Sequence, residues 1–408
     1  MPLALSLIFK GVDVMAQRHE ILSDNIASLQ VVAGDNWLSP PITMLHGGDP
    51  INVSFDDLTH EYRRYAYKLE HCEADWSVST ELFASDFCEG FNEDNIIDDV
   101  TESINTNTLY THYRLQIPNE NCKIKMSGNY KLTVYDENTG EEVMNACFMV
   151  VDPKVNVRLG VTSNTDIDTN KSHQQVSMDL NFSGIKVNRF DDEIKTVVMQ
   201  NGRWDNAVLN ATPQYVTADA ASWNHNKALI FNAGNEYRKF ETLDVTHTTM
   251  GIESVEWDGK DYHANVWTDE PRTNYVYDED ANGAFYIRNS DNRENDVTTE
   301  YVIVNFRLKA NRQNNDIFIN ANWTNDRFLD KYKMVYDPAT ELYTASIKLK
   351  QGYYSYQYLS LDSEGKAHPL ASEGNFFQTE NMYQALVYYK GSGQRTCQLV
   401  GYQQVNLK

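Results

Sequence analysis

The chain of 408 residues contains little cysteine. Its five cysteines stand at positions 72, 88, 122, 147 and 397, and no two of them form a Cys-x-x-Cys pair. This spacing excludes a zinc knuckle, a thioredoxin-like redox motif and a densely cross-linked disulfide scaffold. The first four cysteines can pair in three ways in an oxidising compartment, or they can be buried free thiols. The sequence alone leaves both alternatives open.

Positive charge is also scarce. Lysine and arginine together number 35 against 58 aspartates and glutamates, which gives a formal net charge of −23. Nucleic-acid phosphates and anionic lipid headgroups repel such a chain, and no block of lysine and arginine offsets the repulsion. We therefore expect no nucleic-acid partner and no direct membrane insertion, and the charge favours partners that are neutral or basic.

Long hydrophobic runs are absent. The apolar run from Pro2 to Phe9 is far shorter than the roughly 20 residues that a membrane-spanning helix needs. Val14 and Ala16 place small residues at the −3 and −1 positions of a cleavage site before Gln17. We interpret residues 1–16 as a signal peptide that lacks the usual basic start, and we expect an exported, soluble mature protein.

Helical periodicity is nearly absent, and alternation of apolar and polar residues takes its place. In residues 302–308, for example, Val302, Val304 and Phe306 point to one side while the residues between them point to the other. Turn signals such as "YDENTGEE" and "DEDANGAF" separate these stretches. The pattern predicts an all-β fold of tandem immunoglobulin- or fibronectin-like β-sandwich domains, which we place at residues 17–152, 153–297 and 298–408.

The stretch "YAYKLEHCEADWS", from Tyr65 to Ser77, combines the residue types of a thiol nucleophile and its base. On a strand, however, His71 and Cys72 point to opposite faces and do not form a Cys–His pair with each other. We therefore interpret the stretch as a sandwich core strand that turns at Asp75 and Trp76. A Cys/His enzyme is the weakest of three functional hypotheses.

Several sequence blocks of the first segment resemble those of a known family in their residues and in their order along the chain. They are "SPPITMLHGGDPINVSFDDL", "YAYKLEHCEADW", "THYRLQIPNEN" and "MSGNYKLTVYD", and they cover most of residues 39–152. Together they resemble the plug-protein family of the type IX secretion system of Bacteroidota. The resemblance implies a non-catalytic periplasmic protein without a cofactor. Such a protein binds the outer-membrane translocon β-barrel of that system and closes its periplasmic opening.

The residues that carry this signature have structural roles in our interpretation. They are Tyr65, Tyr67, Leu69, His71, Cys72, Asp75, Trp76, Tyr113, Gly128 and Tyr130.

The segment from Asn314 to Asp362 resembles early-set β-sandwich modules of the glycogen-branching type. In sugar-binding relatives, exposed aromatic rings stack on glucan, and Trp323 matches the start of that pattern. We therefore keep an exported carbohydrate-binding or carbohydrate-active protein as the alternative hypothesis, with Trp323 as its interaction aromatic. Trp323 can equally be a core residue, which is the more common role of a tryptophan.

Motifs for other chemistry do not occur. The chain has no His-Glu-x-x-His, no Gly-x-Ser-x-Gly and no phosphate-binding P-loop. Its acidic clusters at 55–58, 191–195 and 278–280 lack the spacing of a calcium loop. The sequence therefore predicts no catalytic, cofactor-binding or metal-binding residues, and the plug is the first hypothesis.

Overall fold

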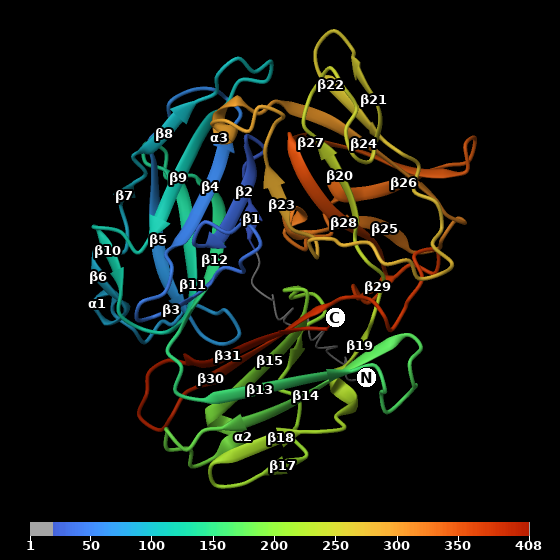
Figure 1. The fold of residues 1–408 in the computed structure, drawn as a ribbon. Coiled ribbons are helices and arrows are strands. Elements are labelled where there is room, and N and C mark those ends of the chain that lie inside the picture. Colours follow the sequence, from blue (N-terminus) through green and yellow to red (C-terminus); the bar gives the residue numbers. More distant parts are fainter. Residues whose placement is uncertain (1–18, 408) are drawn as a thin grey trace, which may run out of the picture.

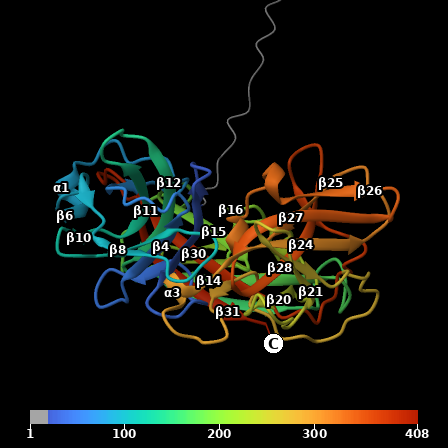
Figure 2. The same ribbon diagram turned by 90° about the horizontal axis from the view of Figure 1, so that it is seen from above.

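The computed structural model describes residues 19–407, which form three β-sandwich lobes (Figure 1). The all-β prediction is confirmed, and the predicted signal peptide lies outside the described residues. The first lobe (residues 20–151), the second lobe (residues 156–232 and 382–406) and the third lobe (residues 238–370) lie around a common centre. From above, the first and third lobes lie side by side over the second (Figure 2).

The first lobe packs two sheets face to face. One has the order β1 (Glu20–Ile21), β12 (Glu142–Val151), β11 (Gly128–Asp136), β5 (Tyr65–Cys72) and β7 (Asn95–Ile96), with β3 (Ile42–Met44) beside β12. The other has the order β2 (Ile26–Ala33), β4 (Ile51–Asp57), β9 (Thr111–Ile117) and β8 (Asp99–Glu102). A separate ribbon joins β6 (Cys88–Gly90) to β10 (Cys122–Ile124) and follows α1 (Ala84–Phe87).

The second lobe is built from two distant parts of the chain. Its first sheet contains β13 (Asn156–Thr162), β14 (His173–Asn181), β18 (Ala220–Trp223), β17 (Tyr215–Val216) and β19 (Ile230–Asn232). Its second contains β16 (Val208–Leu209), β15 (Ile194–Gln200), β30 (Met382–Tyr389) and β31 (Gln398–Asn406). Two short helices, α2 (Phe190–Glu193) and η1 (Lys227–Leu229), complete the lobe.

The third lobe is an insertion into the second lobe, because its strands follow β19 and precede β30 in the chain. Its strands form one curled sheet of ten, together with α3 (Asn295–Thr298), η2 (Asn322–Thr324) and η3 (Asp330–Tyr332). The strands in chain order are β20 (Arg238–Thr242), β21 (Ile252–Trp257), β22 (Tyr262–Val266), β23 (Phe285–Ile287), β24 (Tyr301–Lys309), β25 (Asp316–Asn320), β26 (Lys333–Asp337), β27 (Leu342–Lys350), β28 (Gly352–Leu361) and β29 (Ala367–Pro369).

This insertion differs from the segments expected at 153–297 and 298–408. Residues 382–406 return to the second lobe, where β30 pairs with β15 from Ile194↔Tyr389 to Gln200↔Tyr383. Alternation identifies the C-terminal residues as strands, but their partner is chosen by packing between distant segments. A local pattern therefore cannot show which sheet they join.

An apolar interface joins the first and second lobes. The first lobe contributes Cys72, Trp76 and Met149, and the second contributes Leu386 and Tyr388, all of them buried. Because apolar surface removed from water stabilises a contact at about 25 cal/mol per Å², side chains of this size hold the two lobes together.

A polar interface joins the first and third lobes. Lys350 Nζ lies 2.7 Å from Asp56 Oδ2, and the two side chains are 1% and 0% exposed. The Tyr301 hydroxyl donates to the same carboxylate over 2.6 Å, and His112 Nδ1 lies 2.6 Å from Asp56 Oδ1. Burial alone would raise the pKa of Asp56, but Lys350 and His112 outweigh it and hold this pKa below its usual range.

The segments through which the chain enters and leaves the third lobe are also bonded to each other and to that lobe. Arg238 binds Glu373 in a bidentate ion pair with distances of 3.0 and 2.7 Å, and Arg272 Nη2 lies 2.6 Å from the same carboxylate. The Asn381 amide donates to the carbonyl of Ala233 over 2.8 Å. The insertion is therefore anchored where the chain enters it and where the chain leaves it.

Lys350→Met tests the polar interface. We expect it to lower the free energy of unfolding by about 3–5 kcal/mol, because it leaves the Asp56 carboxylate buried without its main counter-charge. Urea unfolding followed by circular dichroism measures the loss. The exposed Lys366 is the matched control, and Lys366→Met is expected to change stability by less than about 0.5 kcal/mol. Equal losses in both variants would contradict the role of Lys350.

Candidate functional site

The stretch from Tyr65 to Ser77 forms β5 and the turn after it. His71 is buried; its Nδ1 lies 2.9 Å from Ser79 Oγ and its Nε2 lies 3.2 Å from the carbonyl oxygen of Ser127. Burial lowers the pKa of His71, and burial raises the pKa of Cys72 to about 12. Cys72 belongs to the apolar interface, so a neutral histidine and an inert thiol occupy opposite sides of this strand.

The tyrosines of the signature are buried in the core of the first lobe and hydrogen-bonded at their hydroxyls. Tyr65 donates to Asp57 over 3.0 Å, and Tyr67 accepts a bond of 2.8 Å from Asn119. Leu69 follows two positions after Tyr67 on the same face of the strand and is also fully buried. Buried aromatic rings with satisfied hydroxyls are typical of sandwich cores.

The other two signature tyrosines bind backbone carbonyls. The Tyr113 hydroxyl donates to Arg63 over 2.9 Å, and the Tyr130 hydroxyl donates to Met126 over 2.7 Å. Each bond fixes the path of a loop against the core.

Trp76 connects the turn after β5 to the second lobe. Its backbone is left-handed at φ +67°, its side chain is 6% exposed, and its ring meets Trp204 edge-on at 5.6 Å. Asp75 supports the turn, because its carboxylate accepts from the backbone and the hydroxyl of Ser77 over 3.0 and 2.6 Å. The two residues therefore shape a corner that packs against another lobe.

Gly128 opens β11 beside His71. Its φ is +148°, and a Cβ atom there would stand 2.2 Å from His71 Nε2. Both the backbone angle and the close approach require glycine at this position.

Gly128→Ala is expected to lower the free energy of unfolding by about 2–5 kcal/mol, since it adds backbone strain and displaces a buried imidazole. Gly140 supplies the control: its φ is also positive, at +73°, but a Cβ there meets nothing within 4 Å. Gly140→Ala is expected to cost only about 1–2 kcal/mol. Thermal unfolding compares the two, and similar losses would show that the contact with His71 is unimportant.

Trp323, the candidate sugar-stacking residue, is buried in the third lobe. It is 7% exposed, its ring stacks on Phe306 at 6.3 Å, and its indole N–H donates to the carbonyl of Ser355 over 3.1 Å. Tyr354 meets it edge-on at 5.8 Å. The ring therefore presents no face to solvent, in line with the core alternative.

The five cysteines fall into two groups. Cys72, Cys147 and Cys397 belong to the apolar interface, whereas Cys88 and Cys122 face each other across the ribbon of β6 and β10. The two Sγ atoms of this pair lie 2.8 Å apart, and both residues are buried. Among the cysteine pairings that the sequence left open, the structure places Cys88 and Cys122 within bonding reach of each other.

Oxidised glutathione is expected to convert Cys88 and Cys122 into a disulfide. The two thiols lose two protons and two electrons, and one glutathione disulfide is reduced to two glutathione thiols. Peptide mapping by mass spectrometry without reduction identifies the cross-linked pair. Cys88→Ser is the control and should abolish the cross-link, and preferential bridging of Cys72 would contradict this pairing.

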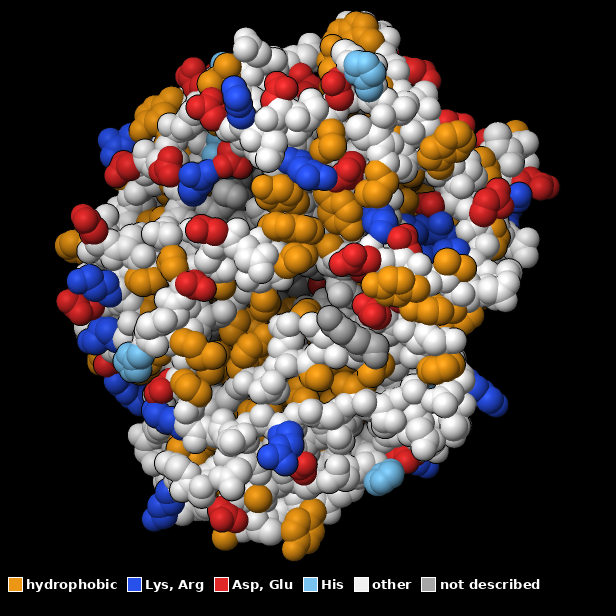
Figure 3. Space-filling model, in the orientation of Figure 1, with side chains coloured by type: hydrophobic (Ala, Val, Ile, Leu, Met, Phe, Trp, Pro, Cys, Tyr) orange, Lys and Arg blue, Asp and Glu red, His pale blue; other side chains and the backbone are white. Residues whose placement is uncertain are grey.

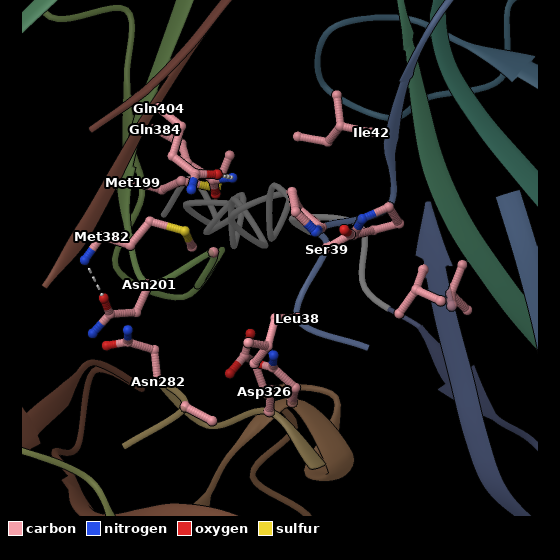
Figure 4. A pocket seen from close by; sticks show the side chains of 18 of the residues that line it. Leu38, Ser39, Ile42, Met199, Asn201, Asn282, Asp326, Met382, Gln384 and Gln404 are labelled. Carbon is pink, nitrogen blue, oxygen red and sulfur yellow. Dashed lines mark hydrogen bonds between the residues drawn. The ribbon is translucent and has the colours of Figure 1, made fainter. Parts of the chain in front are cut away.

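A cavity of about 350 Å³ lies where the three lobes meet (Figure 4). The first lobe presents Leu38, Ser39 and Ile42 on one side. The second presents Met199, Met382 and Gln384, and the third presents Asn282 and Asp326 below them. The space-filling view shows the surface hollowed at this junction, with hydrophobic side chains on both sides of the hollow (Figure 3).

The walls of the cavity combine apolar side chains with many side-chain amides. Met382 points its sulfur into the space, while its backbone N–H donates to Asn201 over 2.8 Å. The amide side chains that line the cavity are Gln30, Asn201, Asn282, Asn322, Asn325, Asn381, Gln384, Gln404 and Asn406.

Acidic groups dominate the charge of the cavity. Asp280, Asp326 and Glu380 line it, and burial raises the pKa of Asp280 to about 7. His19 is the one basic side chain among the described lining residues, and burial lowers its pKa to about 4, so it is neutral near pH 7. The cavity is therefore neutral to negative.

Sequence reasoning missed this cavity. Its residues come from seven or more separate segments of the three lobes, and none of them forms a recognisable motif. No signal in the sequence marks a site that exists only when the lobes are assembled.

Within residues 19–407, no group of three or more histidine, cysteine, aspartate or glutamate side chains is arranged to hold a metal ion. In the same part of the chain, no helix has the length and the apolar character that crossing a membrane requires.

Known proteins resemble this chain at two levels. Residues 26–152 match the family described as "Type 9 secretion system plug protein 1st domain". The chain is also 37% identical to a hypothetical protein from Parabacteroides merdae ATCC 43184, whose crystal structure gives a TM-score of 0.92. The alignment covers 96% of this chain and 99% of that one.

A second solved structure is the C-terminal domain of the antigen I/II-family protein AspA from Streptococcus pyogenes. It is 8% identical, with coverage of 93% of this chain and 98% of that one, but its TM-score of 0.16 is too low to indicate a common fold. No curated protein matches the chain.

Proposed function

We propose that this chain, whose residues 26–152 match the first domain of type 9 secretion system plug proteins, is a non-catalytic periplasmic plug. In this proposal it binds the outer-membrane translocon β-barrel and closes its periplasmic opening. The observation that carries the proposal is the family match over residues 26–152, which span nearly the whole first lobe. This match supports a role in type IX secretion.

The physical properties of the chain support such a role. A body that closes an aqueous opening has to resist deformation, and here three lobes are joined by an apolar interface, a buried ion pair and two anchored linkers. The net charge of −23 keeps the surface well hydrated. A partner that must release the plug requires a polar contact of this kind rather than a hydrophobic one.

The carbohydrate alternative has less support. It is based on the resemblance of residues 314–362 to early-set modules, with Trp323 as the interaction aromatic, but that ring is buried against Phe306 and Tyr354. Tyr356 and Tyr358 are buried as well, and their hydroxyls donate to Asp269 over 2.8 and 2.7 Å. These rings serve the core of the third lobe.

Affinity capture tests the proposal. A tagged chain is incubated with detergent-solubilised outer membranes of a Bacteroidota species that has the secretion system. It is expected to enrich one very large β-barrel protein, because the plug binds the closed translocon directly. A charge-matched, unrelated β-sandwich protein controls for nonspecific binding.

Conductance of the isolated barrel in a planar bilayer then separates closure from mere binding. Adding the chain on the periplasmic side is expected to lower the conductance. Failure to capture a barrel, together with retention on amylose resin, would favour the carbohydrate alternative. Capture without any fall in conductance would refute the closing role.

A further inference from the structure

Strand β2 has one unpaired edge. It is the terminal strand of its sheet and pairs only with β4 among the described residues. Gly34 donates its backbone N–H to Pro50 over 2.8 Å, and Val32 stands opposite Asn52 in the same register. Since alternate residues of an antiparallel strand bond to the same neighbour, the N–H and C=O groups of Val31 and Ala33 point to the other edge.

That edge faces the cavity. Four consecutive residues of β2, from Leu29 to Val32, line the cavity. Successive side chains of a strand point to opposite faces, so a space above one face would touch only every second residue. A space that touches four in a row lies along the edge of the strand, where the free backbone groups of Val31 are.

An unpaired strand edge inside a molecule is costly. Val31 is 7% exposed, and its edge-facing N–H and C=O have no backbone partner within residues 19–407. Buried backbone groups are nearly always hydrogen-bonded, and open edges readily accept another strand. The open edge therefore favours a ligand that has a peptide backbone of its own.

The surroundings of the edge suit an extended peptide. Apolar side chains such as Trp37, Met199 and Met382 can receive alternate side chains of an added strand, and the amides on the opposite wall can bond its backbone. Asp280, Asp326 and Glu380 disfavour an acidic occupant, since no positively charged side chain lines the cavity among the described residues.

We propose that the cavity binds an extended, neutral or basic peptide segment of a partner protein, which adds to the open edge of β2 as a further strand. The proposal rests on the open edge of β2 and the lining of the cavity, and not on the proposed contact with the barrel. Its test is therefore independent of barrel capture.

The probe is a fluorescein-labelled nonapeptide, Ac-VKLKVKLKV-NH₂, with Ac-VELEVELEV-NH₂ as its charge-reversed partner. Fluorescence anisotropy with the full chain is expected to show binding of the lysine peptide and at least about tenfold weaker binding of the glutamate peptide. Residue-resolved hydrogen exchange is expected to show new protection of the Val31 amide. Val32 already bonds to β4, so its amide should change little.

Matched methionine variants locate the binding. Met382→Trp fills the cavity and should weaken binding at least about tenfold. Met250→Trp alters a methionine that is 41% exposed and lies outside the cavity, and it should leave binding unchanged. The exchange of Val31 is measured on the unaltered chain, so the test does not depend on the folding of a variant.

Three results would overturn the proposal. The first is peptide binding that neither protects Val31 nor responds to Met382→Trp. The second is protection of Val31 by maltoheptaose instead of the peptide, which would identify a glycan site. The third is a loss of Val31 protection when residues 1–16 are removed without any added peptide, which would identify the chain's own leading segment as the occupant.

Discussion

The pairing of β30 with β15 is the contact on which the arrangement of the three lobes depends. It returns the C-terminal residues 382–406 to the second lobe and makes the third lobe an insertion with two anchored ends. An insertion held at one end is free to swing, but one held at both ends has few orientations left. The ion pair between Asp56 and Lys350 then selects one of them.

The two interfaces of the first lobe have different physical characters. The apolar interface with the second lobe is non-directional and tolerates small adjustments. The polar interface with the third lobe is directional, because a buried carboxylate with three partners is satisfied in one geometry only. Together they fix the distance between the lobes and therefore the size of the cavity, so that the cavity is a product of the assembly and not of any single lobe.

The sequence predicted some of these features for clear physical reasons. Alternation on β5 separates His71 from Cys72, because the side-chain period of a strand is two and depends on nothing distant. The sequence pattern placed Gly128 just before the strand that carries Tyr130. The reason for a glycine at this position is the imidazole of His71, some 57 positions earlier, which only the fold brings close. In contrast, the return of residues 382–406 and the cavity depend on contacts between segments that are distant in the sequence. No local sequence pattern indicates such contacts.

The central claim is that this three-lobed body closes the periplasmic opening of a secretion barrel. The most direct measurement is a cryo-electron microscopy map of the translocon isolated together with the chain. The account predicts density for all three lobes, in the arrangement described above, across the periplasmic mouth of the barrel. A map in which the mouth is open while the chain is bound elsewhere would contradict it.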